Sequence, residues 1–354
     1  MTNEPTKLTV FISTPLEQEH VDELRVVAPD EIDVLYEPDL LPPTRYVADH
    51  KGDEAFERSP EQEQRWQEHL SHADVLWDFP PAASDATGGL AYASRVKWIQ
   101  ATSTGVGRTV ERLGLVNSDV LVTTARGVHA GSLAEFAMLT LLSHAKHQRH
   151  MQEESDQRRW DRFCSDDLEG KTLAIVGVGS IGLRVAAVGR AFGMRIVALA
   201  RPGSDHTADE LSVDELFPAE RLHEMLAETD ALVLAVPDTP DTTGLMDRAA
   251  FAALKPGAVF VNVARGQVVD EVALIESLGN GQVAFAGLDV FAVEPLPAES
   301  PLWDLPNVII SPHSASTVAS ENRKITEIFS FNLRCYVEGR EGDMMNVLDK
   351  ARLY

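Results

Sequence analysis

The stretch from Leu173 to Arg201 constrains the fold of this chain more than any other. An apolar run precedes the string Gly177-Val-Gly179-Ser180-Ile181-Gly182, and a second apolar run ends at Ala200 after a segment of helical character. Apolar runs of this length are typical of buried parallel strands, and glycines placed between a strand and a helix indicate a tight turn. The sequence therefore predicts a strand at 173–177, a helix at 183–192 and a strand at 196–200.

The glycine spacing in this unit also predicts a ligand. In a strand–turn–helix context, Gly177 permits the turn, Gly179 lets the backbone approach a pyrophosphate, and Gly182 lets the helix pack closely on the strand. The N–H groups of Ser180 and Ile181 would face the phosphates, helped by the helix dipole. A dinucleotide cofactor is the favoured interpretation, and a glycine-rich turn without a ligand is the alternative.

The residues at the end of the second strand bear on the choice of cofactor. An NAD-binding unit carries an acidic residue about twenty positions after the last glycine, where this chain has Ala200 and Arg201. An arginine can pair with the 2′-phosphate of NADP, and Ser204 could add a hydroxyl. NADP is therefore favoured over NAD, unless Arg201 is a solvated loop residue.

Length and charge limit the possible classes of protein. The chain has 354 residues, which is comfortable for two domains. Its formal net charge of −24 argues against a nucleic-acid or anionic-membrane partner. A small anionic substrate stays possible, because local arginines can hold it. The acidity favours solubility, with adaptation to salt as an alternative reason.

The cysteines, histidines and apolar runs indicate a cytoplasmic protein without a bound metal. Cys164 and Cys335 are too few and too far apart for a disulfide framework. No carboxylate or cysteine joins His144, His147 and His150 at ligand spacing, so no metal site is predicted. The N-terminal residues 1–10 lack the pattern of a secretory signal, and the apolar runs are too short for a membrane span.

The rest of the chain alternates between short apolar runs and helical segments, which predicts an α/β fold with parallel sheets. A first domain is expected at 1–129 plus 316–354, and a second at 130–315. Further strands are predicted at 8–13, 32–36, 74–77, 97–100, 120–123, 231–236, 258–263, 284–289 and 308–311. Helices are predicted at 61–70, 131–147, 221–228, 248–254, 270–278 and 316–337. Residues 40–66 are interpreted as a surface insertion, with a loop that reaches toward a substrate as the alternative, and 148–170 as a polar segment.

Polar residues follow the late strands, at the edge where open α/β sheets bind ligands. Reduction of a carbonyl by hydride needs a proton donor, and imidazole titrates near neutral pH. A carboxylate on the other ring nitrogen would favour the protonated form, and an arginine can bind a substrate carboxylate. His313, Glu294 and Arg265 could supply these three roles, although each alone could equally be structural.

Four motifs follow one another along the chain: Gly177-Val-Gly-Ser-Ile-Gly182, Asn262-Val-Ala-Arg265-Gly266, Asp289 followed by Glu294-Pro295, and Pro301-Leu-Trp through Ser311-Pro-His313. With these motifs in family order, the chain closely resembles the NAD(P)-dependent D-2-hydroxyacid dehydrogenase family from about Val96 to Val337. It implies a flavodoxin-like substrate domain and a Rossmann dinucleotide-binding domain, both doubly wound, in a protein that is usually a dimer.

The resemblance implies a role for each site residue. His313 is similar to the family's proton donor and acceptor, Glu294 to its partner, and Arg265 to the ligand of the substrate carboxylate. The remaining implied roles are backbone contacts to that carboxylate from Val106 and Gly107, contacts to the nicotinamide amide from Asp289 and the Val263 carbonyl, and a loop over the ribose with Pro237 and Thr242. The sequence after Gly107, Arg108-Thr-Val, departs from the family pattern. The resemblance therefore does not predict how the wall of the substrate site is formed.

The resemblance therefore implies an oxidoreductase that interconverts a 2-oxo acid and a D-2-hydroxy acid with NADPH or NADH. The alternative is a dinucleotide-sensing binding protein like the C-terminal-binding-protein corepressors, which keep the same catalytic residues. A formate dehydrogenase fits less well, because that relative pairs its histidine with glutamine.

Overall fold

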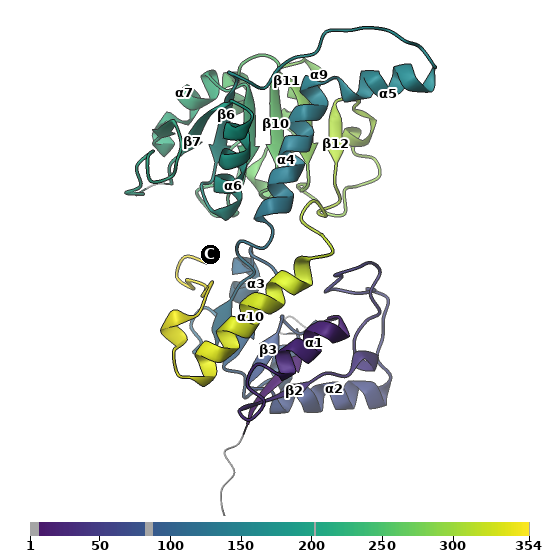
Figure 1. Ribbon diagram of the computed structural model, residues 1–354, viewed down its shortest axis with the longest axis vertical. Helices are drawn as coiled ribbons and strands as arrows, with labels where there is room; N and C mark the ends of the chain where they lie inside the picture. Colours follow the sequence, from purple (N-terminus) through teal and green to yellow (C-terminus); the bar gives the residue numbers. More distant parts are fainter. Residues whose placement is uncertain (1–6, 82–87, 202, 354) are drawn as a thin grey trace, which may run out of the picture. The chain divides into compact units, whose positions relative to one another are not determined.

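The computed structural model describes residues 7–81, 88–201 and 203–353, and the chain divides into two compact units (Figure 1). Unit 1 holds Met1–Val128 with Thr317–Tyr354, and unit 2 holds His129–Ser316. Each unit is a parallel sheet covered by helices on both faces, which confirms the predicted fold class. The strands form where apolar runs alternate with helical segments, since both faces of a parallel sheet are buried.

The sheet of unit 1 has the strand order β2-β1-β3-β4-β5, with every pair parallel. This is the flavodoxin-like order, as the family resemblance implies. Its strands are β1 (Leu8–Ile12), β2 (Ile32–Leu35), β3 (Val75–Trp77), β4 (Trp98–Gln100) and β5 (Leu121–Thr123).

Two apolar clusters fill the two faces of this sheet. On one face, Trp77 and Trp98 pack against Phe329 and its neighbours on α10. On the other face, Leu76 and Ile99 pack with Trp66 of α2. The helices of unit 1 are α1 (Gln18–Arg25), α2 (Pro60–His72), α3 (Gly107–Arg112) and α10 (Glu321–Val337).

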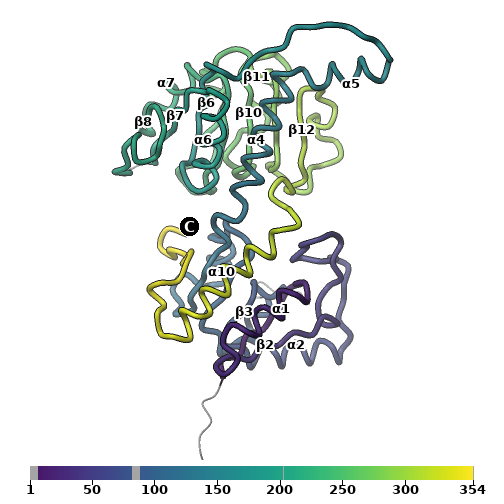
Figure 2. Tube along the Cα trace, in the orientation of Figure 1, coloured from purple at the N-terminus to yellow at the C-terminus, as the bar shows by residue number. Residues whose placement is uncertain are grey.

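The sheet of unit 2 has the order β12-β11-β10-β9-β6-β7-β8, again all parallel (Figure 2). The direction of winding reverses between β6 and β9, which is the switch point where Rossmann sheets bind dinucleotides. Its strands are β6 (Thr172–Val176), β7 (Arg195–Leu199), β8 (Glu215–Phe217), β9 (Ala231–Leu234), β10 (Ala258–Asn262), β11 (Val283–Leu288) and β12 (Val308–Ile310).

Helices α4 and α6 cover one face of this sheet, and α7, α8 and α9 cover the other. Gly189 of α6 lets that helix approach the sheet, because a Cβ there would lie 2.5 Å from Leu173 Cδ2. The helices of unit 2 are α4 (Ala130–Ala145), α5 (Gln148–Asp156), α6 (Ser180–Ala191), α7 (Leu222–Ala227), α8 (Arg248–Ala253) and α9 (Glu271–Gly279). Short 3-10 helices lie at η1 (Pro38–Leu40), η2 (Gly88–Tyr92), η3 (Ala219–Arg221), η4 (Gly266–Val268), η5 (Pro301–Asp304) and η6 (Glu341–Asp343).

Three elements differ from the sequence prediction. Residues 148–156, interpreted as part of a polar segment, form α5, whose exposed face carries the ion pair between Arg149 and Glu153 instead of an apolar stripe. The edge strand β8 was not predicted, because it is short and only Phe217 is fully buried. Helix α3 was also not predicted, since it spans six residues and begins at a glycine.

Within the described ranges, no helix combines the length and apolar character needed to cross a bilayer. The interpretation that the chain lacks a secretory signal concerns residues 1–10, of which 1–6 lie outside the described ranges.

Candidate functional site

The turn between β6 and α6 requires glycine at two of its positions. Gly177 has a φ of +103°, and a Cβ there would lie 2.5 Å from the carbonyl oxygen of Ala235, just after β9. A Cβ on Gly182 would lie 1.9 Å from the carbonyl oxygen of Gly177. These contacts hold the start of α6 tightly against the switch point between β6 and β9.

Gly179 has a different environment, because nothing lies within 4 Å of the position that a Cβ would occupy. It is the N-cap of the twelve-residue helix α6 and offers no side-chain cap, so the first N–H groups of the helix, at Ser180 and Ile181, have no intrahelical partner. Helix N–H groups without an intrahelical partner, next to the open space at Gly179, fit a pyrophosphate. The residues present therefore fit a dinucleotide.

Arg201 lies two residues beyond the end of β7, and its side chain is exposed. Ala200 N–H donates to the carbonyl of Phe217 on β8, and Ser204 N–H donates to the carbonyl of Arg201. The end of β7 thus carries a cation and no carboxylate, at the place where the adenosine ribose binds in this type of sheet.

Two of the predicted cofactor residues lie in the loop that follows β9. The Thr242 hydroxyl donates to the Pro237 carbonyl at 2.7 Å and accepts from Thr239 N–H at 2.8 Å. Thr242 therefore holds the loop closed on itself. Val263, directly after β10, is buried, and its N–H donates to the carbonyl of Leu234.

Asp289, directly after β11, organises the segment that carries His313. Its carboxylate is almost fully buried, and its Oδ1 accepts hydrogen bonds from Ser311 Oγ at 2.7 Å, Ser314 N–H at 2.9 Å and Ala315 N–H at 2.8 Å. The His313 N–H donates to the Asp289 carbonyl at 2.9 Å. The three donors lie on both sides of His313 in the chain. Asp289 therefore holds the turn in which His313 adopts a φ of +52°.

His313 and Glu294 form a directly bonded pair. His313 Nδ1 lies 2.8 Å from Glu294 Oε2, and the carboxylate's other oxygen accepts from Phe291 N–H at 3.0 Å. Because a carboxylate accepts the bond, the hydrogen is on Nδ1, and Nε2 is the atom that can face a reactant. The side chains are 46% and 36% exposed, so the pair can be reached from solvent.

The charge of Glu294 is favoured by its surroundings. Partial burial acts to raise the pKa of this carboxyl, but the hydrogen bonds from His313 and Phe291 N–H, together with the charges of His313 and Arg265, hold its pKa below the usual value. Glu294 is thus an anion at neutral pH, and its bond to Nδ1 orients the imidazole.

Arg265 is positioned by a turn that follows β10. The buried Asn262 side chain accepts from Ala264 N–H at 3.0 Å and donates to the Arg265 carbonyl at 3.2 Å. Gly266 allows close packing here, because a Cβ would lie 1.8 Å from the Phe291 carbonyl oxygen. Arg265 Nη1 donates to the Ala264 carbonyl at 2.6 Å. The loops that carry Arg265 and Glu294 therefore lie against each other.

Val106 and Gly107 belong to unit 1, where they follow β4. Val106 is the N-cap of α3 and Gly107 its first residue. The Val106 N–H donates to the Thr104 carbonyl at 3.2 Å, whereas the Gly107 N–H, at the first position of the helix, has no intrahelical acceptor. Arg108 follows within the same short helix.

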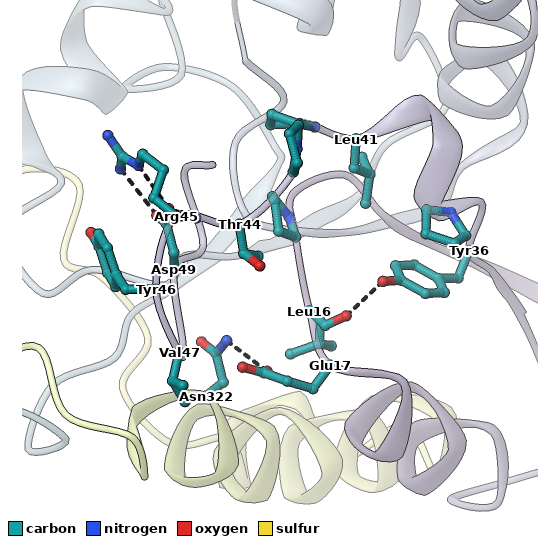
Figure 3. Close-up of a pocket in the computed structure, with 14 residues that line it drawn as sticks. Leu16, Glu17, Tyr36, Leu41, Thr44, Arg45, Tyr46, Val47, Asp49 and Asn322 are labelled. Carbon is teal, nitrogen blue, oxygen red and sulfur yellow. Dashed lines mark hydrogen bonds and ion pairs between the residues drawn. The ribbon is translucent and has the colours of Figure 1, made fainter. Parts of the chain in front are cut away.

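Unit 1 also contains a pocket of about 570 Å³, whose lining includes Pro15–Glu17, residues 41–47, Asp49 and Asn322. Figure 3 shows three bonded pairs on its lining, Arg45 with Asp49, Asn322 with Glu17, and Tyr36 with the Leu16 carbonyl. The insertion that supplies these pocket residues leads into α2, which begins with a capping box. Helix α2 includes the predicted helix at 61–70. Whether this insertion contacts a substrate stays a prediction.

Two positioning residues were not assigned a role from the sequence. Asn262 and Ser311 both lie at the carboxyl ends of strands, within strings that the sequence already singles out. Their small polar side chains after buried strands were the available signal. Their partners could not be identified, because the bonds join segments that only the folded sheet brings together.

The profile of the family described as D-isomer specific 2-hydroxyacid dehydrogenase, NAD binding domain, matches residues 138–315, half of the chain. The chain belongs to this family. The match covers the glycine turn, Arg265, Glu294 and His313, and it ends two residues after that histidine.

Curated members of the dehydrogenase family resemble the chain at about the same level. D-3-phosphoglycerate dehydrogenase of Mycobacterium tuberculosis is 38% identical over 227 residues, which cover 61% of this chain and 42% of that protein. Glyoxylate reductase of Thermococcus gammatolerans is 36% identical over 244 residues, covering 64% and 72% of the two chains. The chain therefore spans less than half the length of the mycobacterial relative that it matches.

A solved structure of the family extends the likeness to both units. The D-isomer specific 2-hydroxyacid dehydrogenase from Xanthobacter autotrophicus Py2, in complex with NADPH and MES, aligns with a TM-score of 0.75 at 28% identity. The alignment covers 99% of this chain and 100% of that one.

Proposed function

We propose that this protein reduces a small 2-oxo acid to a D-2-hydroxy acid with NADPH, or catalyses the reverse oxidation. The observation that carries the proposal is the 2.8 Å contact between His313 Nδ1 and Glu294 Oε2. It supports the proposal because an imidazole paired with a carboxylate, which can act as a proton donor, lies at the carboxyl edge of a sheet that also carries the glycine turn.

Each residue has a defined task in this reaction. When bound, the cofactor supplies or accepts the hydride. His313 Nε2 delivers a proton to the carbonyl oxygen as the carbonyl carbon is reduced, and it takes that proton back in the oxidation. Glu294 stabilises the imidazolium through Nδ1. Arg265 binds the substrate carboxylate and polarises the carbonyl, and the Gly107 N–H is the proposed second contact to that carboxylate.

The relatives support this class of reaction. The two curated relatives are named D-3-phosphoglycerate dehydrogenase and glyoxylate reductase, and both names denote chemistry at a 2-hydroxy or 2-oxo acid. NADPH is present in the Xanthobacter structure. Arg201 supports NADP for this chain, because a guanidinium can pair with a 2′-phosphate that NAD lacks.

The direct test is the absorbance of reduced nicotinamide, with NADPH and NADH in parallel, against glyoxylate, hydroxypyruvate and phenylpyruvate. Turnover with at least one acid is expected. Tight NADPH binding without turnover on any 2-oxo acid would instead favour a dinucleotide-sensing protein.

The variant Arg201→Ala tests the cofactor assignment. Loss of a charge-assisted contact should weaken NADPH roughly ten- to hundredfold while leaving NADH nearly unchanged. The matched control is Arg190→Ala, since that exposed arginine on α6 pairs with Asp214. Equal losses for NADPH and NADH in Arg201→Ala would reject the assignment.

We also propose a homodimer in the cytoplasm, acting on a small molecule and not on nucleic acid or a membrane. The family resemblance supports the dimer, and two widely separated cysteines suit a reducing compartment. Light scattering after size-exclusion chromatography gives the mass directly, and a mass of one chain would exclude the dimer.

A further inference from the structure

The C-terminal segment, residues 344–353, is built into the sheet of unit 1. Residue Val347 forms an antiparallel bridge with Thr123 of the edge strand β5. On either side of it, Thr124 N–H donates to the Asn346 carbonyl at 3.0 Å and Leu348 N–H donates to the Val122 carbonyl at 2.9 Å. The segment thus adds one antiparallel pairing to a sheet that is otherwise parallel.

Beyond this pairing, the segment turns and is anchored again. Lys350 Nζ donates to the Ser118 carbonyl at 2.8 Å, and Leu353 N–H donates to the Asp349 carbonyl at 2.7 Å. Leu348 is buried in the same apolar cluster as Val106 and Val110, and Leu353 packs against that cluster. The segment and helix α3 therefore share one core.

The segment ends against Gly107. A Cβ on Gly107 would lie 2.4 Å from the Leu353 carbonyl oxygen and 2.8 Å from Leu353 Cβ. Gly107 is not among the glycines with positive φ, so its own backbone conformation does not require glycine. The requirement comes from Leu353, which occupies the space that any larger residue at position 107 would need.

We infer that the C-terminal segment, through Leu353, positions the loop at Val106 and Gly107 and thereby sets the affinity for the substrate carboxylate. This inference rests on the proposed function, in which the Gly107 N–H contacts that carboxylate. Leu353 acts through the loop and is a positioning residue. A backbone N–H selects its ligand only if the backbone is held in place, and here residues 344–353 supply the support.

The test is a cycle of four proteins: the full-length chain, a chain that ends at Ala351, Gly107→Ala, and the two changes together. In the full-length chain, Gly107→Ala should raise the KM for the 2-oxo acid about tenfold, because the new methyl group displaces the loop. In the shortened chain the same substitution should change KM less than about twofold, since the clashing atoms are gone.

The shortened chain alone should raise KM about threefold or more, with kcat and the Kd for NADPH unchanged. Lys350→Met, which removes the anchor on Ser118, should act in the same direction. Arg352→Ala is the matched control, because this exposed side chain pairs with Asp349 within the segment itself. A general loss of folding would lower kcat and cofactor affinity as well, so the split between KM and kcat separates positioning from structure.

The outcomes are distinguishable from failure of the proposed function. If the full-length chain reduces no 2-oxo acid, the proposed function is wrong and this inference falls with it. If the full-length chain turns over but the shortened chain keeps the same KM, or if Gly107→Ala has equal effects in both backgrounds, only the inference is wrong.

Discussion

At the scale of single residues, the placement of His313 depends on more than its bond to Glu294. The backbone of His313 is left-handed, which is unusual for a residue other than glycine. The hydrogen bonds of Asp289 to the residues around it hold that conformation. A buried carboxylate that makes several bonds can thus fix the backbone of the proposed proton donor without contacting its side chain.

Asp49 gives a prediction for pH dependence. This buried carboxylate accepts bonds from Arg45 and from the N–H groups of Lys51 and Gly52. Burial acts to raise its pKa, but the bonds from Arg45 and the backbone outweigh burial and hold the pKa far below the usual value. A depressed pKa stabilises the fold above the unfolded value of about 4, and this contribution is lost as pH falls below it.

The variant Asp49→Asn should therefore cost about 2 kcal/mol of unfolding free energy at pH 7 and much less near pH 2. Denaturant unfolding at the two pH values measures the difference. Asp53→Asn is the control, because Asp53 is exposed and its carboxylate accepts only from Ala55 N–H among the described contacts. An equal cost of Asp49→Asn at both pH values would contradict the account.

At the scale of elements, two glycines of the β6–α6 turn have different roles: Gly182 is needed for packing, and Gly179 for the proposed cofactor contact. Gly182→Ala should destabilise the protein by about 3 kcal/mol, because its Cβ would meet the backbone of Gly177. Gly179→Ala has open space for its methyl group and should leave the melting temperature nearly unchanged. It should nevertheless weaken NADPH about tenfold, a cost of about 1.4 kcal/mol.

Isothermal titration and thermal melting of the two variants check this prediction. Unchanged NADPH affinity in a stable Gly179→Ala protein would mean that the phosphates bind elsewhere.

The elements also show what could be predicted from the sequence. Buried parallel strands are fully apolar, so the runs at β6, β9 and β10 were sufficient to predict them. Polar α5 and the half-exposed edge strand β8 carry no such signal, and neither was predicted. The resemblance named His313 and Glu294, but the bonds of Asp289 to 311–315 could not be predicted, since they form only when β11 and β12 pair.

At the scale of the whole molecule, the net charge of −24 is a destabilising factor at low ionic strength, because like charges repel in the compact state. Salt shortens the Debye length from about 30 Å at 0.01 M to about 10 Å at 0.1 M. The melting temperature should therefore rise by several degrees over this range at pH 7.

The control is the same titration near the isoelectric point of about 4.8, where the net charge vanishes and the gain should largely disappear. A salt response of equal size at both pH values would show that screening of the net charge is not its cause.

The central claim of the proposed function is that a 2-oxo acid receives a hydride from the bound cofactor and a proton from His313. The most direct measurement compares NADPH oxidation by the wild type and by His313→Ala on the best 2-oxo acid, with NADPH affinity measured by fluorescence titration in parallel. The account predicts that kcat falls roughly 100- to 10 000-fold while the affinity for NADPH is kept. Unchanged turnover, or an equal loss of turnover and NADPH binding, would contradict it.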